Sequence, residues 1–268
     1  MTVGTIEKRR RRTTPAPAKP AASRRGWLWA LLQIGLVGGE IFALLFLLAQ
    51  PAFRPRHVVV VGVKHLSAAQ VTDTLNLPSD RNVFLLNQAD LANRLQVLPW
   101  VRSARVSLAL PDRVAVSVIE WTPSAVLQVG EGTYYLNDLG EVLDPAVEAG
   151  SLTVINRPGF GAARDGQHAV GSDLLPMLIQ LRAGFSAAFK ISVTSFQLDG
   201  REVLTAQTDR GWTIIFGQMV TGEDRASLEP KLAALRALSS RIDFVSAPIQ
   251  YINLENSRAP AVQMRPHK

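Results

Sequence analysis

The chain has 268 residues, a formal net charge of +7 and no cysteine. The lack of cysteine excludes a disulfide framework and thiolate metal sites. Residues 1–25 hold eight basic side chains and one acidic side chain, whereas the remainder holds equal numbers of each. The high isoelectric point therefore describes a short N-terminal arm and says little about the rest of the chain.

Residues 1–25 are rich in Arg, Pro, Ala and Thr and poor in large apolar residues, which predicts a disordered, basic cytoplasmic tail. The basic run Lys8–Arg12 fits two roles. The favoured one is topology determination with attraction to anionic lipid headgroups, and the other is binding of nucleic acid or a protein partner. Twenty-five residues without an apolar core cannot fold into a module that reads nucleic acid, so no nucleic-acid partner is expected.

Residues 26–49 form an apolar run that is interrupted only by Gln33 and Glu40, and they predict a transmembrane helix. A helix of this length spans roughly 36 Å, against a hydrocarbon core of about 30 Å. Basic residues are more frequent before the run than after it, which predicts residues 1–25 inside and 50–268 outside. A cleaved secretory or twin-arginine signal is less favoured, because the apolar run is long and Leu48–Ala52 is a poor cleavage site.

Glu40 lies inside this predicted membrane helix, where a carboxylate is costly. We expect it to contact a helix of a partner protein. A protonated or snorkelling side chain without a partner is the alternative. The expected location of the whole chain is the cytoplasmic (inner) membrane, with a single membrane pass.

The residues after this helix, 57–120, follow the order of a compact β-α-α-β-β unit. The β-branched run Val58–Val63 predicts a buried strand. Ser67 is a suitable N-cap for a following helix, and Gln70 stands three residues later, where it completes a capping box. These signals place a helix directly after the first strand.

A second helix is expected to begin after Asn87, which is a good N-cap. Its apolar residues have helical spacing: Leu91, Leu95 and Leu98. Alternating apolar residues on both sides of Pro111-Asp112 predict two strands joined by a turn. Trp100, next to Pro99, is expected to pack at a seam between domains.

Residues 123–262 predict a second, β-rich domain, in which two or more helices pack on an antiparallel sheet, followed by a tail at 263–268. The strongest hairpin signal is Asp199-Gly200 between two apolar runs. Helices are expected at about residues 173–183, with Gly184 as the C′ residue, and from about Pro230 through Leu238. Residues 248–254 predict a final strand. The fold class is therefore α+β.

No catalytic motif is present in the sequence. The chain lacks a Ser-x-x-Lys motif, a Gly-x-Ser-x-Gly elbow, a phosphate-binding Gly-Lys pair and helical His-x-x-x-His spacing. We therefore expect no enzymatic activity, no cofactor and no metal site. A membrane-anchored cell-wall enzyme stays open as an alternative, because some active sites need only two carboxylates that are close in space.

The order of elements and several motifs resemble the FtsQ/DivIB family of bacterial cell-division proteins. The motifs that carry the resemblance are Val58–Val63 with Leu66-Ser67, Asn82–Asn87, Leu98-Pro99-Trp100-Val101 with Ala104 and Val106, Leu110–Arg113 with Val116, Glu120 and Pro123, and Asp138–Val142. The resemblance implies a POTRA domain at residues 54–122. It also implies a non-enzymatic scaffold of the septal cell-wall machinery, enriched at the division septum.

The implied partners are small bitopic division proteins of the FtsB/DivIC and FtsL type, with other divisome proteins contacting the POTRA domain. A late strand followed by polar residues can form an exposed sheet edge, which recruits a partner strand through main-chain hydrogen bonds. One departure is Asn253-Leu254-Glu255, where the family often has Asp-Leu-Arg. The expected partner-binding residues are Tyr251, Ile252, Asn253, Leu254, Glu255, Asn256, Arg258, Val262 and Met264.

Another POTRA-containing protein, working in secretion or envelope assembly, is the main alternative function. Such proteins usually carry several POTRA units or a long barrel, whereas this chain has one such unit and too few residues for a barrel.

Overall fold

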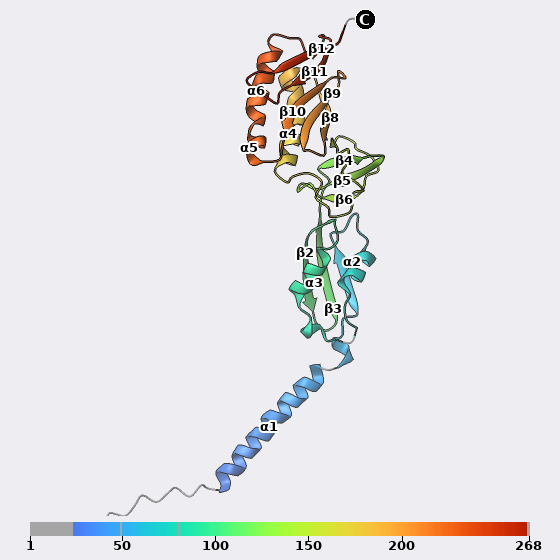
Figure 1. Cartoon of the computed structure of the whole chain (residues 1–268). Helices are drawn as coiled ribbons and strands as arrows, with labels where there is room; N and C mark the ends of the chain where they lie inside the picture. Colours follow the sequence, from blue (N-terminus) through green and yellow to red (C-terminus); the bar gives the residue numbers. More distant parts are fainter. Residues whose placement is uncertain (1–23, 49, 80, 267–268) are drawn as a thin grey trace, which may run out of the picture. The chain divides into compact units, whose positions relative to one another are not determined.

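The computed structural model describes residues 24–48, 50–79 and 81–266 (Figure 1). It divides into two units, Met1–Phe53 and Arg54–Lys268. The tail predicted to be disordered lies outside the described residues, apart from its last two positions. The first unit contains the helix α1 (Arg24–Leu48) and the short 3-10 helix η1 (Pro51–Phe53).

Helix α1 contains the segment Trp29–Leu47, which has a mean hydropathy of 2.1. Leucine is a strong helix former, and no proline interrupts the segment. Among the described residues, it is the one helix that is long and apolar enough to cross a membrane. The prediction of a single N-terminal apolar helix is confirmed, and it fits single-pass anchoring.

The second unit begins with a three-stranded sheet and two helices. Strand β1 runs parallel to β3, β2 runs antiparallel to β3, and the strand order is β1-β3-β2. This is the β-α-α-β-β order expected of a POTRA domain. The elements are β1 (His57–Val61), α2 (Ala68–Leu75), η2 (Val83–Leu85), α3 (Gln88–Leu95), β2 (Val101–Ala109) and β3 (Arg113–Glu120).

Local hydrogen bonds fix where the two helices begin. The Gln70 N–H donates to Ser67 Oγ at 3.1 Å, and the Ser67 N–H donates to Gln70 Oε1 at 2.8 Å. Asn87 caps α3 by accepting a bond from the Ala89 N–H at 3.0 Å. Both predicted caps are confirmed, and the apolar faces behind them are buried at Val71, Leu75, Leu91 and Leu95.

Strand β1 is less buried than the β-branched run predicts. Its residues alternate between exposed and half-buried, and Val59 and Val61 are 51% and 53% exposed. The reason is its place at an edge of the sheet, with helices covering one face only. The prediction of a buried strand is therefore wrong for these two side chains.

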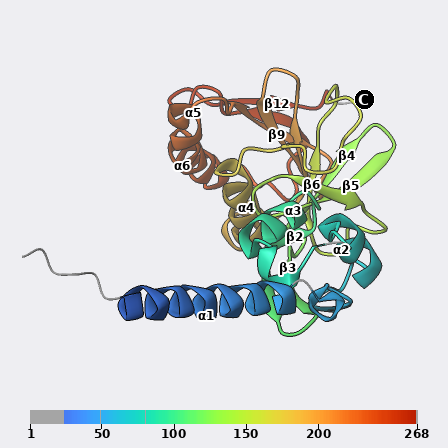
Figure 2. The same cartoon turned by 90° about the horizontal axis from the view of Figure 1, so that it is seen from below.

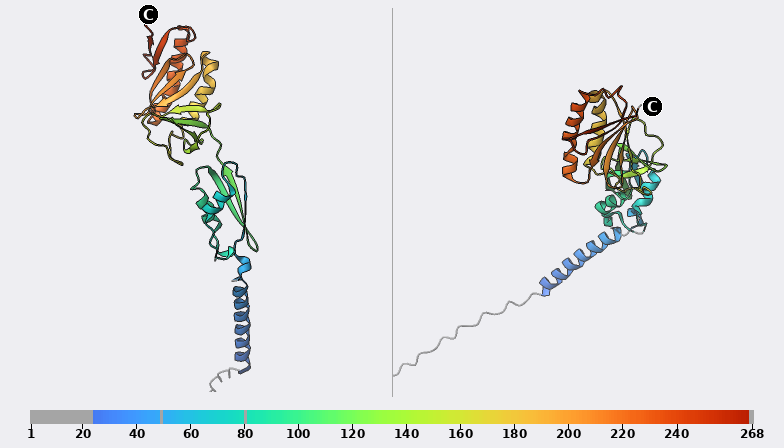
Figure 3. Two further views of the ribbon diagram at one scale, coloured as in Figure 1. Left: turned by 90° about the vertical axis from the view of Figure 1, so that its right-hand side faces the viewer. Right: turned by 45° about the horizontal axis from the view of Figure 1, so that its top comes forward.

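A nine-stranded sheet forms the rest of the second unit, with the strand order β12-β11-β10-β9-β8-β7-β4-β5-β6. Helices α4 and α6 lie on the same face of this sheet (Figures 2 and 3). The elements are β4 (Ala125–Val129), β5 (Gly132–Leu136), β6 (Val142–Pro145), β7 (Thr153–Asn156), α4 (Leu174–Phe189), β8 (Val193–Leu198), β9 (Val203–Thr208), β10 (Thr213–Gln218), α5 (Gly222–Ala226), α6 (Leu228–Ser239), β11 (Ile249–Asn253) and β12 (Ala261–Met264).

The α+β class is confirmed, but the large sheet is mixed and not antiparallel as predicted. Three neighbouring pairs are parallel: β4 with β7, β7 with β8, and β10 with β11. Parallel neighbours need a crossover connection, and helices supply two of them. Helix α4 connects β7 to β8, and helices α5 and α6 connect β10 to β11.

Helix α4 is longer than predicted. It continues through Gly184 to Phe189, and its C-cap is Lys190 in the left-handed conformation with φ of 58°. Phe185 and Phe189 are 1% and 6% exposed, so the last turn packs into the core. Burial of these two rings outweighs the local cost of a glycine in the helix, which is about 1 kcal/mol.

Candidate partner-binding surface

The two ends of the nine-stranded sheet differ in accessibility. At one end, residues 166–168 cover β6. The Val142 N–H donates to the Gln167 carbonyl at 2.9 Å, and the Gly166 N–H donates to the Val142 carbonyl at 2.7 Å. An isolated bridge between Glu141 and His168 extends this cover. The β6 edge is therefore already paired with its own chain at Val142, the first residue of this strand.

Strand β12 forms the other end of the sheet, and it pairs with β11 alone in the described part of the chain. Its side chains are half-buried at Val262 and exposed at Ala261, Gln263 and Met264. The outer side of β12 therefore offers main-chain groups to a partner.

The sequence predicts this edge one strand too early. Tyr251, Ile252 and Asn253 lie on β11, which pairs with β10 on one side and with β12 on the other. Leu254 is fully buried, and its N–H donates to the Ile215 carbonyl at 2.8 Å. These four residues are correctly predicted as strand or strand end, but their main chain is not an open edge.

Three further predicted residues lie in the connection between β11 and β12. The Glu255 N–H donates to Asn253 Oδ1 at 2.8 Å, and the Arg258 N–H donates to Asn256 Oδ1 at 3.1 Å. These Asx-type bonds turn the chain so that β12 can return beside β11. Of the predicted set, Val262 and Met264 alone lie on the edge strand.

The direction of each N–H on β12 follows from one hydrogen bond. The Arg265 N–H donates inward, to the Pro248 carbonyl at 2.7 Å. The one register shift in this pair lies between Ile249 and Tyr251, where β11 carries the extra residue, so the alternation along β12 is regular. Main-chain groups of successive strand residues point to opposite sides. The N–H and C=O groups of Val262 and Met264 therefore point away from β11.

Prolines bracket these outward groups. Pro260 and Pro266 have the same parity as Val262 and Met264, so both prolines lie where an outward N–H would otherwise stand. The outer edge therefore presents two N–H donors, at Val262 and Met264, between two positions that cannot donate. A partner strand can therefore pair here over a short length only, and the two prolines fix its alignment.

Glu255 also takes part in a charge cluster with Asp224 and a lysine of α6. Lys231 on α6 is only 6% exposed, and burial lowers the pKa of its ammonium, while the carboxylates of Asp224 and Glu255 oppose the shift. Glu255 stands where the resemblance described above leads one to expect arginine. Its carboxylate favours the charged form of the buried Lys231.

Glu40, the remaining predicted site residue, lies on α1 within the segment Trp29–Leu47. Its side chain is exposed on the helix surface. In the described ranges, no group of three His, Asp or Glu side chains could hold a metal ion.

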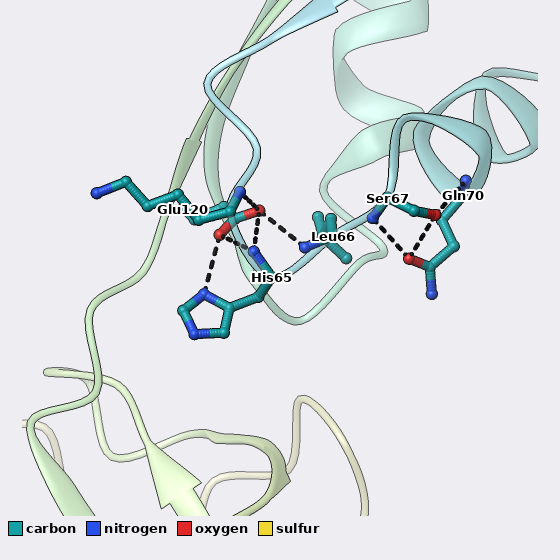
Figure 4. Close-up of polar contacts among 6 residues, drawn as sticks. His65, Leu66, Ser67, Gln70 and Glu120 are labelled. Atoms are coloured by element: carbon teal, nitrogen blue, oxygen red, sulfur yellow. Dashed lines mark hydrogen bonds and ion pairs between the residues drawn. The ribbon is translucent and has the colours of Figure 1, made fainter.

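The POTRA domain contains a carboxylate site that the sequence does not single out. Glu120, at the end of β3, has a side chain that is 4% exposed. Its carboxylate accepts bonds from the N–H groups of Lys64 at 2.9 Å, His65 at 2.9 Å and Leu66 at 3.0 Å (Figure 4). The Glu120 side chain thus joins the loop before α2 to the last strand of the domain.

The neighbouring aromatic residue belongs to the same site. The imidazole of His65 lies 3.2 Å from Glu120 Oε2 and stacks on the Trp100 ring, with centroids 4.0 Å apart. Trp100 is buried, at 4% exposure. It therefore packs against the loop that Glu120 holds.

Burial favours the neutral form of Glu120, but the three N–H donors outweigh it, so the pKa of this carboxyl lies below its ordinary value. A lowered pKa means that the ionised group stabilises the fold above the pKa of the unfolded chain, about 4.3. This stabilisation is lost as the pH falls through the folded-state pKa.

Replacing Glu120 by glutamine should destabilise the POTRA domain by about 1.5–3 kcal/mol at pH 7, because charged hydrogen bonds to three N–H groups are lost. The loss should shrink at a pH below the folded-state pKa, where the wild-type carboxyl is itself protonated. Denaturant unfolding at both pH values measures the difference. Glu131→Gln, on an exposed turn, is the control and should show no such dependence. An equal loss at both pH values would contradict the role of the charge.

Two family models match the chain over consecutive ranges. The FtsQ-type POTRA domain matches residues 53–121, and the C-terminal domain of cell division protein FtsQ/DivIB matches residues 125–255. The chain belongs to the FtsQ/DivIB family. Its predicted membership is thereby confirmed, and with it the POTRA fold of the first domain.

Individual relatives agree with this family membership. The cell division protein FtsQ of Mycobacterium tuberculosis is 28% identical over 240 residues, which cover 87% of this chain and 71% of the relative. FtsQ of Novosphingobium aromaticivorans is 29% identical over 143 residues, 52% of this chain and 45% of the relative. FtsQ of Chloroflexus aggregans is 30% identical over 151 residues, 54% of this chain and 55% of the relative. Two of these three matches therefore span about half of the relative's length.

The match to the C-terminal FtsQ/DivIB model ends at residue 255, before β12. The edge strand is thus identified by sheet topology and hydrogen-bond direction, independently of that match. A search for apolar alternation alone would miss it, because Ala261–Met264 is short and follows a proline.

Proposed function

We propose that this chain is a membrane-anchored, non-enzymatic scaffold of the bacterial divisome. It links the cytoplasmic, membrane and extracytoplasmic parts of the septal cell-wall machinery. Its partners are bitopic proteins of the FtsB/DivIC and FtsL type, and one of them adds a strand to the outer side of β12. Other divisome proteins contact the POTRA domain, and Glu40 contacts a partner helix in the membrane.

The observation that carries this proposal is the unequal state of the two sheet ends. The β6 end is paired at Glu141 and Val142 with the chain's own residues 166–168, whereas β12 presents outward main-chain groups at Val262 and Met264. Strand addition to such an edge depends on main-chain bonds and needs few specific side chains.

The remaining parts of the proposal follow from the order of the chain. Residues 1–25 lie in the cytoplasm, α1 crosses the membrane, and the units 54–122 and 123–262 lie outside, with enrichment at the septum. The excess of basic residues before α1 supports this orientation.

Replacing Val262 by proline should weaken partner binding about tenfold or more relative to Val262→Ala, because proline removes an outward donor and its ring occupies that side. The pair β11–β12 should survive, since the N–H of Val262 does not contribute to it. Pull-down of an FtsB/DivIC-type partner by both variants, with melting curves, measures the effect.

Proline variants at three other positions test whether the effect is confined to the edge strand. Met264→Pro should act like Val262→Pro, because its N–H also points outward. Proline at Asn256 or Arg258 should have a smaller effect, because both positions lie in the connection and not on the edge. Equal binding by Val262→Pro and Val262→Ala, with equal melting temperatures, would place the interface elsewhere.

A further inference from the structure

One end of the three-stranded POTRA sheet brings two chain segments together. The segment 54–57 leads into β1, and the turn between β2 and β3 lies beside it. The N–H groups of Arg56 and His57 both donate to the Asp112 carbonyl, at 3.0 and 3.3 Å. His57 Nδ1 also lies 2.9 Å from Asp112 Oδ2. These contacts fix the β2–β3 turn to the first residues of the second unit.

This end of the sheet is basic. Arg54 and Arg56 are exposed on the leading segment, and Arg113 is exposed opposite His57 in the strand register. In the described ranges, none of these three guanidinium groups forms an ion pair with a carboxylate, and the nearby carboxylate of Asp112 pairs with His57 instead. The three arginines therefore leave an uncompensated positive charge.

An apolar side chain projects from the same end. Leu110, at the tip of the β2–β3 turn, is 60% exposed. An exposed leucine at the same end of the sheet as three exposed arginines is a composition typical of surfaces that lie in the interface of a bilayer.

The short distance along the chain between α1 and these residues indicates that the lipid bilayer is their partner. Five residues separate Leu48, the last residue of α1, from Arg54. Their Cα atoms are therefore six residue steps apart and lie at most about 20 Å from each other in an extended chain. The headgroup layer adds about 5–8 Å beyond each face of the hydrocarbon core. Covalent connection therefore limits how far Arg54 and Arg56 can lie from the headgroup layer.

We propose that Arg54, Arg56, Arg113 and Leu110 form a lipid-binding surface on the POTRA domain. The three guanidinium groups bind phosphates of anionic lipids in the leaflet next to them, and Leu110 inserts at headgroup depth. This contact holds the POTRA domain in a preferred orientation on the membrane. The inference uses α1 as a membrane anchor and is independent of strand addition at β12.

The test uses the full chain in lipid nanodiscs. Because the chain has no cysteine, Ala109→Cys places one environment-sensitive fluorophore beside Leu110 on an exposed position. Quenching by a nitroxide on lipid headgroups should be strong in discs with 30% phosphatidylglycerol and weak in discs of phosphatidylcholine alone. It should also weaken at 0.5 M NaCl, because salt screens exposed charges.

Charge reversal identifies the residues. Each basic side chain near an anionic surface contributes about a fivefold preference, so the triple change Arg54→Glu, Arg56→Glu and Arg113→Glu should lower the bound population about a hundredfold. Quenching should then fall to its level in neutral discs. The matched control reverses three exposed arginines of the other domain: Arg201, Arg210 and Arg241.

Leu110→Ser tests the apolar part and should reduce quenching by a smaller factor. Equal quenching in anionic and neutral discs would overturn the proposal. An equal loss in the control triple variant would also overturn it, because the effect would then depend on net charge alone.

Discussion

Replacing Gly62 by alanine should destabilise the POTRA domain by about 3–5 kcal/mol, the sum of backbone strain and overpacking. Gly62 has φ of +90°, and a Cβ at this position would lie 2.0 Å from the carbonyl oxygen of Val118. That carbonyl belongs to β3, the central strand of the sheet, so it cannot move away without breaking the ladder. Hydrogen exchange of β1 and β3 in the full chain, followed in denaturant, measures this loss.

A second glycine separates the two contributions. Gly159 has a similar φ of +83°, but no atom lies within 4 Å of a Cβ placed there. Gly159→Ala should therefore cost only the backbone strain, about 1–2 kcal/mol. If both variants lose the same stability, the close approach to Val118 has no energetic consequence and the expected clash is absent.

Much of the POTRA domain could be predicted because its signals are local. The capping box at Ser67 and Gln70, the cap at Asn87 and the helical spacing of Leu91 and Leu95 involve residues within a few positions of each other. All the residues that form such a signal lie within one short stretch of sequence, so the helix can be predicted without knowledge of the fold. The end of this helix is predicted too late: α3 ends at Leu95, so Leu98 lies outside the helix, in the turn before Pro99.

The large sheet could be predicted only in part, since its parallel pairs depend on distant segments. The hairpin around Asp199 is visible in the sequence because its strands are adjacent. Strands β10 and β11 pair although two helices separate them in the sequence, and no short sequence motif predicts this pairing. The sequence therefore predicts the edge at the apolar strand β11, whereas the structure places it at β12.

Most of the predicted partner-binding residues lie off the edge strand for the same reason. Strand β12 has four residues with one β-branched side chain, and β-propensity is a weak guide for a strand this short. The turn before β12 is held by the side chains of Asn253 and Asn256, which accept hydrogen bonds from main-chain N–H groups. Polar residues of this kind are equally common in disordered tails, so the sequence does not indicate the turn. Position in the sheet and the direction of each N–H follow only from the assembled structure.

Replacing Leu95 by alanine should destabilise the POTRA domain by about 2–5 kcal/mol, which is the usual range for a buried leucine. Leu95 is fully buried and packs in a core with Val71, Leu75 and Leu91 between the helices and the sheet. Because the caps at Ser67 and Asn87 fix both helices, the surrounding side chains have little freedom to fill the cavity, and the loss should lie in the upper half of that range.

Val97, two residues further along, provides the matched control because it is 80% exposed. Val97→Ala should change the free energy of unfolding by no more than about 0.5 kcal/mol. Denaturant titration of both variants, read from hydrogen exchange in α2 and α3, gives the comparison. A loss below about 1 kcal/mol for Leu95→Ala would mean that this side chain does not fill the core, since burial of a complete leucine exceeds that value. The face of α3 that packs on the sheet would then differ from the one described.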